Sequence, residues 1–447
     1  MFFEGRLGMR KKYLSLVFIV FIISVSYSQD VFKLPDNKNT DKIRFQLINN
    51  LIVIPVEVNG NELSFLLDTG ISKTIIFNSK NLRKTVETGD SERALLRGLG
   101  EGGTIESLRS RNNIVKIGSA VNKNQDLFAV FDDRLNFTPR LGIPIHGIIG
   151  YDFLKDFVTE INYSSKFLKL NTHEAYIPNT CNTCEVFDLT IHQNKPYVNG
   201  QIRSNNNEIP VMLLIDSGGS DALWLFNNNQ IKFPSDYFDD FLGFGLSGGI
   251  YGKRSRIQGF SLGNFKLSNV NVAYPNSTSI DNGKIVKGRN GSMSGEILKR
   301  FNIVLDLKNK KIALKKNRYF SNAFSYNKSG ITIEQIEVER VIDNDVYFGE
   351  YGKKTVNKVT VDVSGGTKSY IGPAFVIVEI RPESPAYQAG LKFGDILVSI
   401  NGKSAANYSL QDLNNLFYDR EGKRVSLVIN RNGRKRNISF LLQDVFK

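Results

Sequence analysis

Short apolar segments separated by glycine and asparagine turns run along most of the 447-residue chain. A typical example is Ile52–Val58, which leads into an Asn-Gly turn that favours a β-hairpin. One short helix is expected in each half, at Tyr151–Phe157 and Gly295–Phe301, and a longer amphipathic helix only at Ser409–Tyr418. The pattern therefore predicts a mainly β protein.

Three landmarks occur twice in the same order and at a nearly constant offset. An apolar strand runs into Asp68–Gly70, and another runs into Asp216–Gly218. A segment at Gly147–Gly150 has its counterpart at Gly291–Ser294. Between these landmarks lie two glycine-rich hairpins, which contain Gly98, Gly100, Gly102 and Gly103 in the first copy and Gly243, Gly245 and Gly248 in the second. The repeat predicts two pseudo-symmetric lobes, over 30–180 and 185–320.

Paired carboxylates can hydrolyse a peptide bond when both reach the same water. Two carboxyls at that spacing cannot both ionise, so they share a proton: one acts as general base to the water and the other donates to the carbonyl oxygen. A duplicated unit supplies two such groups from facing strand ends, which makes Asp68 and Asp216 the candidate catalytic pair. Their supporting residues are Thr69, Gly70, Ser217 and Gly218, through backbone N–H groups and through hydroxyls that reach across the symmetry axis.

These motifs resemble those of the pepsin/retropepsin superfamily of aspartic proteases over roughly residues 45–315. The resemblance implies two β-barrel lobes, with a cleft between them that binds an extended peptide. It also implies that the two glycine-rich hairpins are flaps over that cleft. The expected activity is that of an aspartic endopeptidase acting on peptide or protein substrates. The alternative is a catalytically inactive peptide-binding protein of the same fold.

The chain departs from that pattern at three positions. The third residue after the aspartate is Ile71 in one copy and Gly219 in the other, where pepsin-like lobes carry a hydroxyl. Without that hydroxyl the ionised carboxylate is less favoured, so the pKa of the pair and the pH of useful activity should be higher than in pepsin-like enzymes. Ser294 replaces the glycine expected behind the second active strand, which makes the second lobe's support the weaker one.

The sequence from 328 to 447 has motifs that differ from those of the two lobes. Its segments Ala389–Leu391, Gly394-Asp395 and Ile400–Gly402 resemble PDZ domains of the bacterial protease-associated kind, small β-domains with two helices. Such domains bind a peptide segment or C-terminus by adding it as a strand to a sheet edge. The candidate carboxylate nest comprises Gly372, Pro373, Ala374 and Phe375, and the helix from Ser409 would form the other wall. The stretch 335–368 reads as an insertion or loop. A β-domain that only packs on the lobes is the alternative.

The N-terminal segment predicts export. Arg10–Lys12 precede the apolar run Tyr13–Val25 and the small polar stretch Ser26–Gln29, as in a secretory signal peptide over 1–28. The run is short for a bilayer span of about 20 residues, so no stable membrane anchor is expected after cleavage. The expected location is the periplasm, the cell surface or the medium.

Composition narrows the chemistry further. Cys181 and Cys184 are the only cysteines and are expected to form a local disulfide, with a redox role as the alternative. Two cysteines and three histidines make a zinc site unexpected, and neither a metal nor a cofactor is predicted. The net charge of +14 is spread over turns and strand edges, which favours solvated edges over a nucleic-acid surface. A serine protease is excluded, because no Gly-x-Ser-x-Gly motif lies near a suitable histidine.

Overall fold

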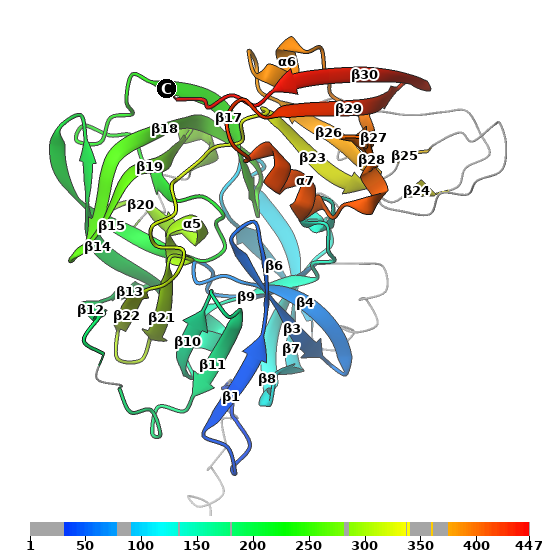
Figure 1. The fold of residues 1–447 in the computed structure, drawn as a ribbon. Helices are drawn as coiled ribbons and strands as arrows, with labels where there is room; N and C mark the ends of the chain where they lie inside the picture. Colours follow the sequence, from blue (N-terminus) through cyan, green and yellow to red (C-terminus); the bar gives the residue numbers. More distant parts are fainter. Residues whose placement is uncertain are drawn as a thin grey trace, which may run out of the picture.

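The computed structural model describes residues 31–77, 91–132, 135–178, 181–280, 286–336, 338–339, 359–360 and 374–446. The predicted signal peptide, Gly372, Pro373 and most of the expected insertion lie outside these residues. The fold is mainly β, as the sequence predicts (Figure 1). No helix in the described ranges has the length and apolar character needed to cross a bilayer.

The first lobe is built on one eight-stranded sheet that folds back on itself. Strand β3 also pairs with β7, so the sheet curls into a barrel-like shape. The apolar strand β4 leads to Asp68, and β9 lies parallel beside it with Leu67 opposite Ile149. In sheet order the strands are β2 (Gln46–Ile48), β3 (Leu51–Val58), β4 (Asn61–Leu67), β9 (Gly147–Ile149), β5 (Thr74–Phe77), β8 (Ala120–Val130), β7 (Thr104–Ile117) and β6 (Ser91–Arg97).

The second lobe repeats this strand order element by element. Its sheet is closed by an extra pairing of β14 with β18, the counterpart of the β3–β7 pairing. In sheet order the strands are β13 (Thr190–His192), β14 (Lys195–Ser204), β15 (Asn207–Asp216), β20 (Arg289–Ser294), β16 (Leu223–Leu225), β19 (Phe265–Pro275), β18 (Gly248–Leu262) and β17 (Tyr237–Gly245). The matching topology means that β4 and β15, the strands that lead to the two aspartates, are structural equivalents.

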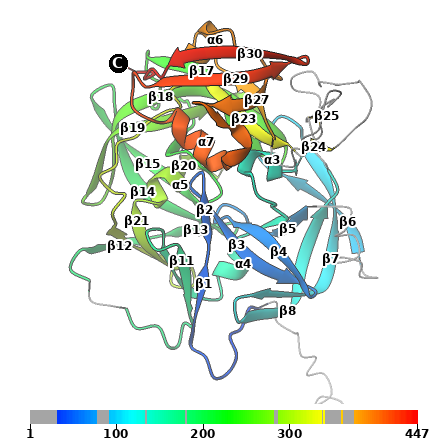
Figure 2. The ribbon, with the colours of Figure 1, turned by 45° about the vertical axis from the view of Figure 1, so that its right-hand side comes forward.

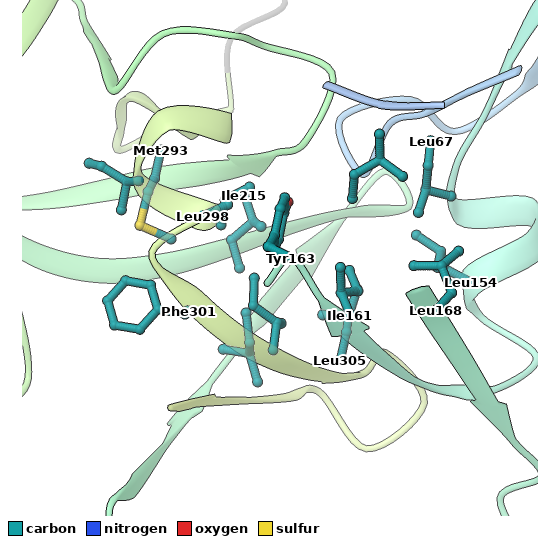
Figure 3. Packing of buried hydrophobic residues seen from close by; sticks show 14 of the residues in the cluster. Leu67, Leu154, Ile161, Tyr163, Leu168, Ile215, Met293, Leu298, Phe301 and Leu305 are labelled. Carbon is teal, nitrogen blue, oxygen red and sulfur yellow. The ribbon is translucent and has the colours of Figure 1, made fainter. Parts of the chain in front are cut away.

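A six-stranded sheet joins the two lobes. Its order is β1 (Thr40–Arg44), β11 (Phe167–Asn171), β10 (Val158–Asn162), β21 (Phe301–Asp306), β22 (Lys311–Lys316) and β12 (Cys184–Asp188). At its centre β10 of one lobe pairs antiparallel with β21 of the other, with Ile161 opposite Ile303. Figure 3 shows Leu67, Ile215, Tyr163 and neighbouring residues packed in one buried cluster, so a single core supports both active strands.

Short helices and a disulfide complete the two lobes. The predicted helices are shorter than expected, α4 (Tyr151–Leu154) and α5 (Gly295–Leu298), because the chain turns into β10 and β21 soon after them. The first lobe also contains α3 (Thr138–Leu141), and the second contains the 3₁₀ turn η2 (Ser277–Ser279). Cys181 and Cys184 form a disulfide in the structure.

The C-terminal domain has its own core and its own sheet. The sheet order is β23 (Ile331–Ile336), β26 (Ala374–Ile380), β27 (Ile396–Ile400), β29 (Arg424–Arg431) and β30 (Arg434–Leu441), with β28 (Lys403–Ser404) beside β27. The helices are α6 (Pro385–Gln388), η3 (Ala405–Asn407) and α7 (Leu410–Phe417), and β24 (Val338–Glu339) pairs with β25 (Val359–Thr360). Ser409 and Asp412 form a capping box that fixes the start of α7, whose Leu413 and Phe417 are fully buried in the domain core.

This domain lies against both lobes (Figures 1 and 2). Arg140 of α3 makes an ion pair with Glu334 of β23, with 2.8 Å between Nε and Oε1. The Asn49 N–H donates to Oε1 of Gln411 on α7 at 3.0 Å. Towards the second lobe, Tyr326, just before β23, donates its hydroxyl to the carbonyl oxygen of Ser255 at 2.7 Å. The contacts place β23 and α7 next to the two lobes.

Candidate active site

The structure brings Asp68 and Asp216 together where the two lobes meet. A Cβ atom built on Gly70 would lie 3.1 Å from Oδ1 of Asp68 and 3.2 Å from Oδ1 of Asp216, so both carboxyls surround one small space. A Cβ on Gly218 would lie 2.3 Å from Oδ2 of Asp68. The two carboxyls also hydrogen-bond to each other. A side chain at Gly218 would overlap the Asp68 carboxyl, and one at Gly70 would crowd both carboxyls, so glycine two residues after each aspartate favours their close approach.

Backbone donors hold each carboxyl in place. The Gly70 N–H donates to Oδ1 of Asp68 at 2.7 Å, and the Gly218 N–H donates to Oδ1 of Asp216 at 3.1 Å. The same bond in both copies follows from the shared Asp-Ser/Thr-Gly turn at the end of β4 and of β15. Each aspartate therefore enters the site with one fixed oxygen and one oxygen left for chemistry.

Two buried hydroxyls lock the strand ends to each other across the lobe interface. The Thr69 N–H donates to Oγ of Ser217, and the Ser217 N–H donates to Oγ1 of Thr69, both at 3.0 Å. In return the Thr69 hydroxyl donates to the carbonyl oxygen of Ile215 at 2.6 Å, and the Ser217 hydroxyl donates to that of Leu67 at 2.8 Å. Each hydroxyl accepts one bond and donates one, so the four bonds fix the spacing of the carboxyls.

The electrostatics of the pair favour one shared proton. Burial, followed by repulsion from Asp216, raises the pKa of Asp68 to about 7. The Gly70 N–H and the positive charge of Lys195 act in the opposite direction. Burial also raises the pKa of Asp216, but the positive charge of Arg289 and the Gly218 N–H oppose this rise. The hydrogen bond between the carboxyls raises the pKa of Asp68 and lowers that of Asp216, as expected when Asp68 is the donor.

The departures at Gly219 and Ser294 are structurally linked. In the first lobe a Cβ on Gly150 would lie 1.9 Å from the carbonyl oxygen of Asp68, so only glycine fits there. In the second lobe the equivalent residue is Ser294, and its Oγ lies 2.8 Å from the point where a Cβ of Gly219 would be. A side chain missing at one position therefore makes room for a side chain at the other. Ser294 thus occupies space beside the second active strand that Gly219 leaves free, and the predicted weaker support of the second lobe stays a prediction.

The two predicted flaps are hairpin tips that touch each other. Gly98, Gly100, Gly102 and Gly103 lie in the β6–β7 turn, and Gly243, Gly245 and Gly248 lie in the β17–β18 hairpin. The carbonyl oxygen of Ser247, in the second hairpin, accepts a hydrogen bond from the Gly102 N–H at 2.6 Å. The Ser247 N–H donates to the Leu99 carbonyl oxygen at 3.0 Å. Its hydroxyl accepts from the Gly98 N–H at 3.1 Å and donates to the Gly103 carbonyl at 2.5 Å. Ser247 therefore connects the hairpins in a closed arrangement.

Two positively charged residues near the pair were not predicted. Lys195 at the start of β14 and Arg289 at the start of β20 both lie within electrostatic reach of Asp216. A lysine directly across a hairpin from the aspartate is a signal in the sequence, but it becomes visible only when the β14–β15 register is known. His146, by contrast, accepts a hydrogen bond from the Ser64 N–H through Nδ1 at 3.0 Å, as a structural residue does.

Of the predicted peptide-binding nest in the C-terminal domain, the structure describes only Ala374 and Phe375. Ala374 and Phe375 begin β26, which is an interior strand paired with β23 on one side and β27 on the other. Phe375 is fully buried. A peptide cannot add to a strand whose two edges are already paired. The two end strands of the sheet are β23 and β30, and β23, which lies beside α7, also contacts α3 of the first lobe.

Comparison with known protein families agrees with this architecture. Residues 54–153 match a family model described as an aspartyl protease, and residues 376–431 match one described as a PDZ domain. No curated protein matches the chain. In the part of the chain that the structure describes, no group of His, Cys, Asp and Glu side chains could hold a metal ion. The chain thus carries a retropepsin-like aspartyl protease domain and, towards its C-terminus, a PDZ domain.

Proposed function

We propose that the protein is an aspartic endopeptidase in which Asp68 and Asp216 act as one catalytic pair. The observation that carries the proposal is the joining of the two carboxyls at the lobe interface, held by four cross-lobe hydrogen bonds of Thr69 and Ser217. Two lobes of the same topology supply the two strand ends that this chemistry needs.

The pKa directions support the following roles. Asp68, the group with its pKa raised to about 7, carries the shared proton, and ionised Asp216 accepts a proton from the attacking water. Asp68 gives its proton to the carbonyl oxygen as the water oxygen bonds to the carbonyl carbon, which forms a neutral tetrahedral diol. Asp216 then returns its proton to the leaving nitrogen, the carbon–nitrogen bond breaks, and a proton of the diol returns to the pair.

The test is hydrolysis of an unfolded protein by the purified full chain. We expect Asp68→Asn and Asp216→Asn each to lower the rate by at least about a thousandfold, because either change removes the base or the acid. Asp188→Asn is the matched control: Asp188 is 84% exposed on β12, where its carboxylate pairs with Lys311. If either active-site variant cleaves at the control's rate, the assignment of the pair is wrong. If the wild type binds extended peptides without cleaving them, the inactive peptide-binding alternative holds.

We further propose that the protein is exported and that its PDZ domain binds peptide segments or C-termini at the β23 edge. The charged and apolar pattern of residues 10–29 supports export, and so does the Cys181–Cys184 disulfide. Helix α7, which packs beside β23 in the domain core, supplies the second wall of the peptide site. Fractionation of the producing cells and N-terminal sequencing of the mature protein test the export.

A further inference from the structure

We propose that Lys195 and Arg289 form a carboxylate-binding subsite beside the catalytic pair. This subsite selects substrates that carry an acidic group within a few residues of the scissile bond. The inference rests on the proposed endopeptidase activity and deepens it by naming a substrate class.

The position of Lys195 follows from the strand register. In the β14–β15 hairpin Tyr197 lies opposite Leu214, and continuing that register by two residues places Lys195 opposite Asp216. Side chains of residues directly opposite in a hairpin project from the same face with Cβ atoms about 5 Å apart. The lysine is half-buried, and it has no hydrogen-bond or ion-pair partner among the described residues. Burial, followed by repulsion from Arg289, lowers the pKa of Lys195, and the negative charges of Asp68 and Asp216 oppose this.

Arg289 approaches the same aspartate from the other neighbouring strand. β20 runs parallel to β15, with Arg289 opposite Met212. The guanidinium is oriented by three contacts: Nε donates to the Gly291 carbonyl at 3.0 Å, Nη2 donates to Oγ of Ser292 at 2.8 Å, and Cζ lies 5.2 Å from the ring centroid of Phe226. Nη1 makes no hydrogen bond within the described ranges. A fixed guanidinium with free donors is suited to a carboxylate.

The net charge of the two cations and the aspartate pair is positive by one unit, which favours the binding of one anion. Neither cation has a carboxylate within 4.0 Å in the described part of the chain. Among carboxyl groups, Asp216 acts electrostatically on both cations and Asp68 acts on Lys195, and the hydroxyl of Tyr197 acts on Arg289. The pair shares a proton and therefore carries one negative charge, whereas Lys195 and Arg289 carry two positive charges. A substrate carboxylate compensates the remaining positive charge, in a partly buried place where charge-assisted hydrogen bonds are strong.

Geometry limits where that carboxylate lies on the substrate. A lysine side chain reaches about 6 Å from its Cα, and an extended peptide advances about 3.3 Å per residue. The recognised group is therefore within about three residues of the scissile bond. It is either a glutamate or aspartate side chain or the free C-terminal carboxylate of a short peptide.

The experiment uses the full chain and a set of matched peptides. One glutamate is moved from three residues before the scissile bond to three residues after it, and each peptide has a glutamine twin. A second set compares free with amidated C-termini. We expect at least one position at which the acidic peptide has a kcat/KM about tenfold above its neutral twin. Lys195→Gln and Arg289→Gln should each lower the acidic peptide's kcat/KM by about tenfold more than that of the neutral twin. Lys266→Gln, a charge change at an exposed position of β19, should alter neither.

The failures of the two proposals are distinguishable. If Lys195→Gln slows acidic and neutral peptides equally and moves the pH profile, the cations only tune the aspartates, and the subsite proposal is overturned. If the wild type cleaves no peptide, the proposed activity fails, and the subsite is judged by the affinity of the Asp68→Asn variant for glutamate and glutamine peptides. Equal affinity for both at every position overturns it. A preference seen only for free C-termini assigns the subsite to the terminal carboxylate.

Discussion

Replacing Asp68 with asparagine should stabilise the protein at alkaline pH while removing its activity. The wild-type side chain is half-buried and its pKa is raised from the ordinary 3.8 to about 7, so folding opposes its ionisation. The difference of about 3 in pKa corresponds to about 4 kcal/mol at 1.36 kcal/mol per pKa unit. Partial exposure of the carboxyl reduces this to about 2–3 kcal/mol. The amide oxygen of the introduced asparagine can still accept from the Gly70 N–H, so the local geometry is kept.

The sign and the pH window are set by the direction of the shift. Because the folded-state pKa is raised, the protonated carboxyl stabilises the fold fully below about pH 3.8, and this contribution is lost as the pH rises through about 7. The advantage of Asp68→Asn should therefore be near zero at pH 3.5 and reach about 2–3 kcal/mol at pH 8.

Equilibrium urea unfolding can follow Trp224, the only tryptophan, whose indole N–H donates to Oδ2 of Asp221 at 2.7 Å. The Asp188→Asn control should change stability by less than about 0.5 kcal/mol at either pH. An equal effect of Asp68→Asn at both pH values would refute the reasoning, because it would mean that the pKa of Asp68 is not raised by folding.

Three further predictions concern the pair and its supports. Hydrolysis should fall as the pH rises through about 7, where the shared proton of Asp68 is lost, and a rate profile confined to strongly acid pH would contradict this. Thr69→Ala leaves the buried Ser217 N–H and Ile215 carbonyl unpaired and should lower the free energy of unfolding in urea by about 2–4 kcal/mol. Thr69→Ser should lower it by less than about 1.5 kcal/mol, and equal losses in the two variants would contradict the explanation. Ser247→Ala removes two of the bonds between the flap tips, so amide exchange at Gly98–Gly103 should speed up roughly fivefold or more. The same rate as in a Ser107→Ala control, which removes a bond in the middle of the β6–β7 hairpin, would count against a closed arrangement.

The duplicated architecture could be predicted from sequence because its signals are local. A strand that ends in Asp-Ser/Thr-Gly, a glycine-rich hairpin and a Gly-x-x-x segment each occupy a few residues, and their repetition implies a symmetric pair of lobes. The mainly β fold, the aspartyl protease domain and the PDZ domain are confirmed. The hydroxyls of Thr69 and Ser217 also lie where this symmetry predicts, because each follows an aspartate at the end of an equivalent strand.

The features that could not be predicted from the sequence depend on contacts between strands that are far apart along the chain. The pairing of β23 with β26 in the PDZ sheet is not predictable, because residues 337–373 separate the two strands in the sequence. In the sequence, Gly219 and Ser294 appear as two unrelated departures from the family pattern. Only the folded sheet brings them together, so that the Ser294 side chain lies where a side chain at Gly219 would be. The position of Arg289 near Asp216 could not be predicted from the sequence either, because it depends on the parallel pairing of β15 and β20.

The ion pair of Arg140 with Glu334 has a mechanical consequence. The same guanidinium lies 3.7 Å from the ring centroid of Phe244 on β17, the strand that leads to the tip of the second flap. One side chain of the first lobe thus touches the edge strand of the PDZ domain and the arm of the opposite flap. Displacement of that arm would therefore also disturb the contact of Arg140 with the PDZ domain, because the first lobe, the second flap and the PDZ domain meet at this one side chain.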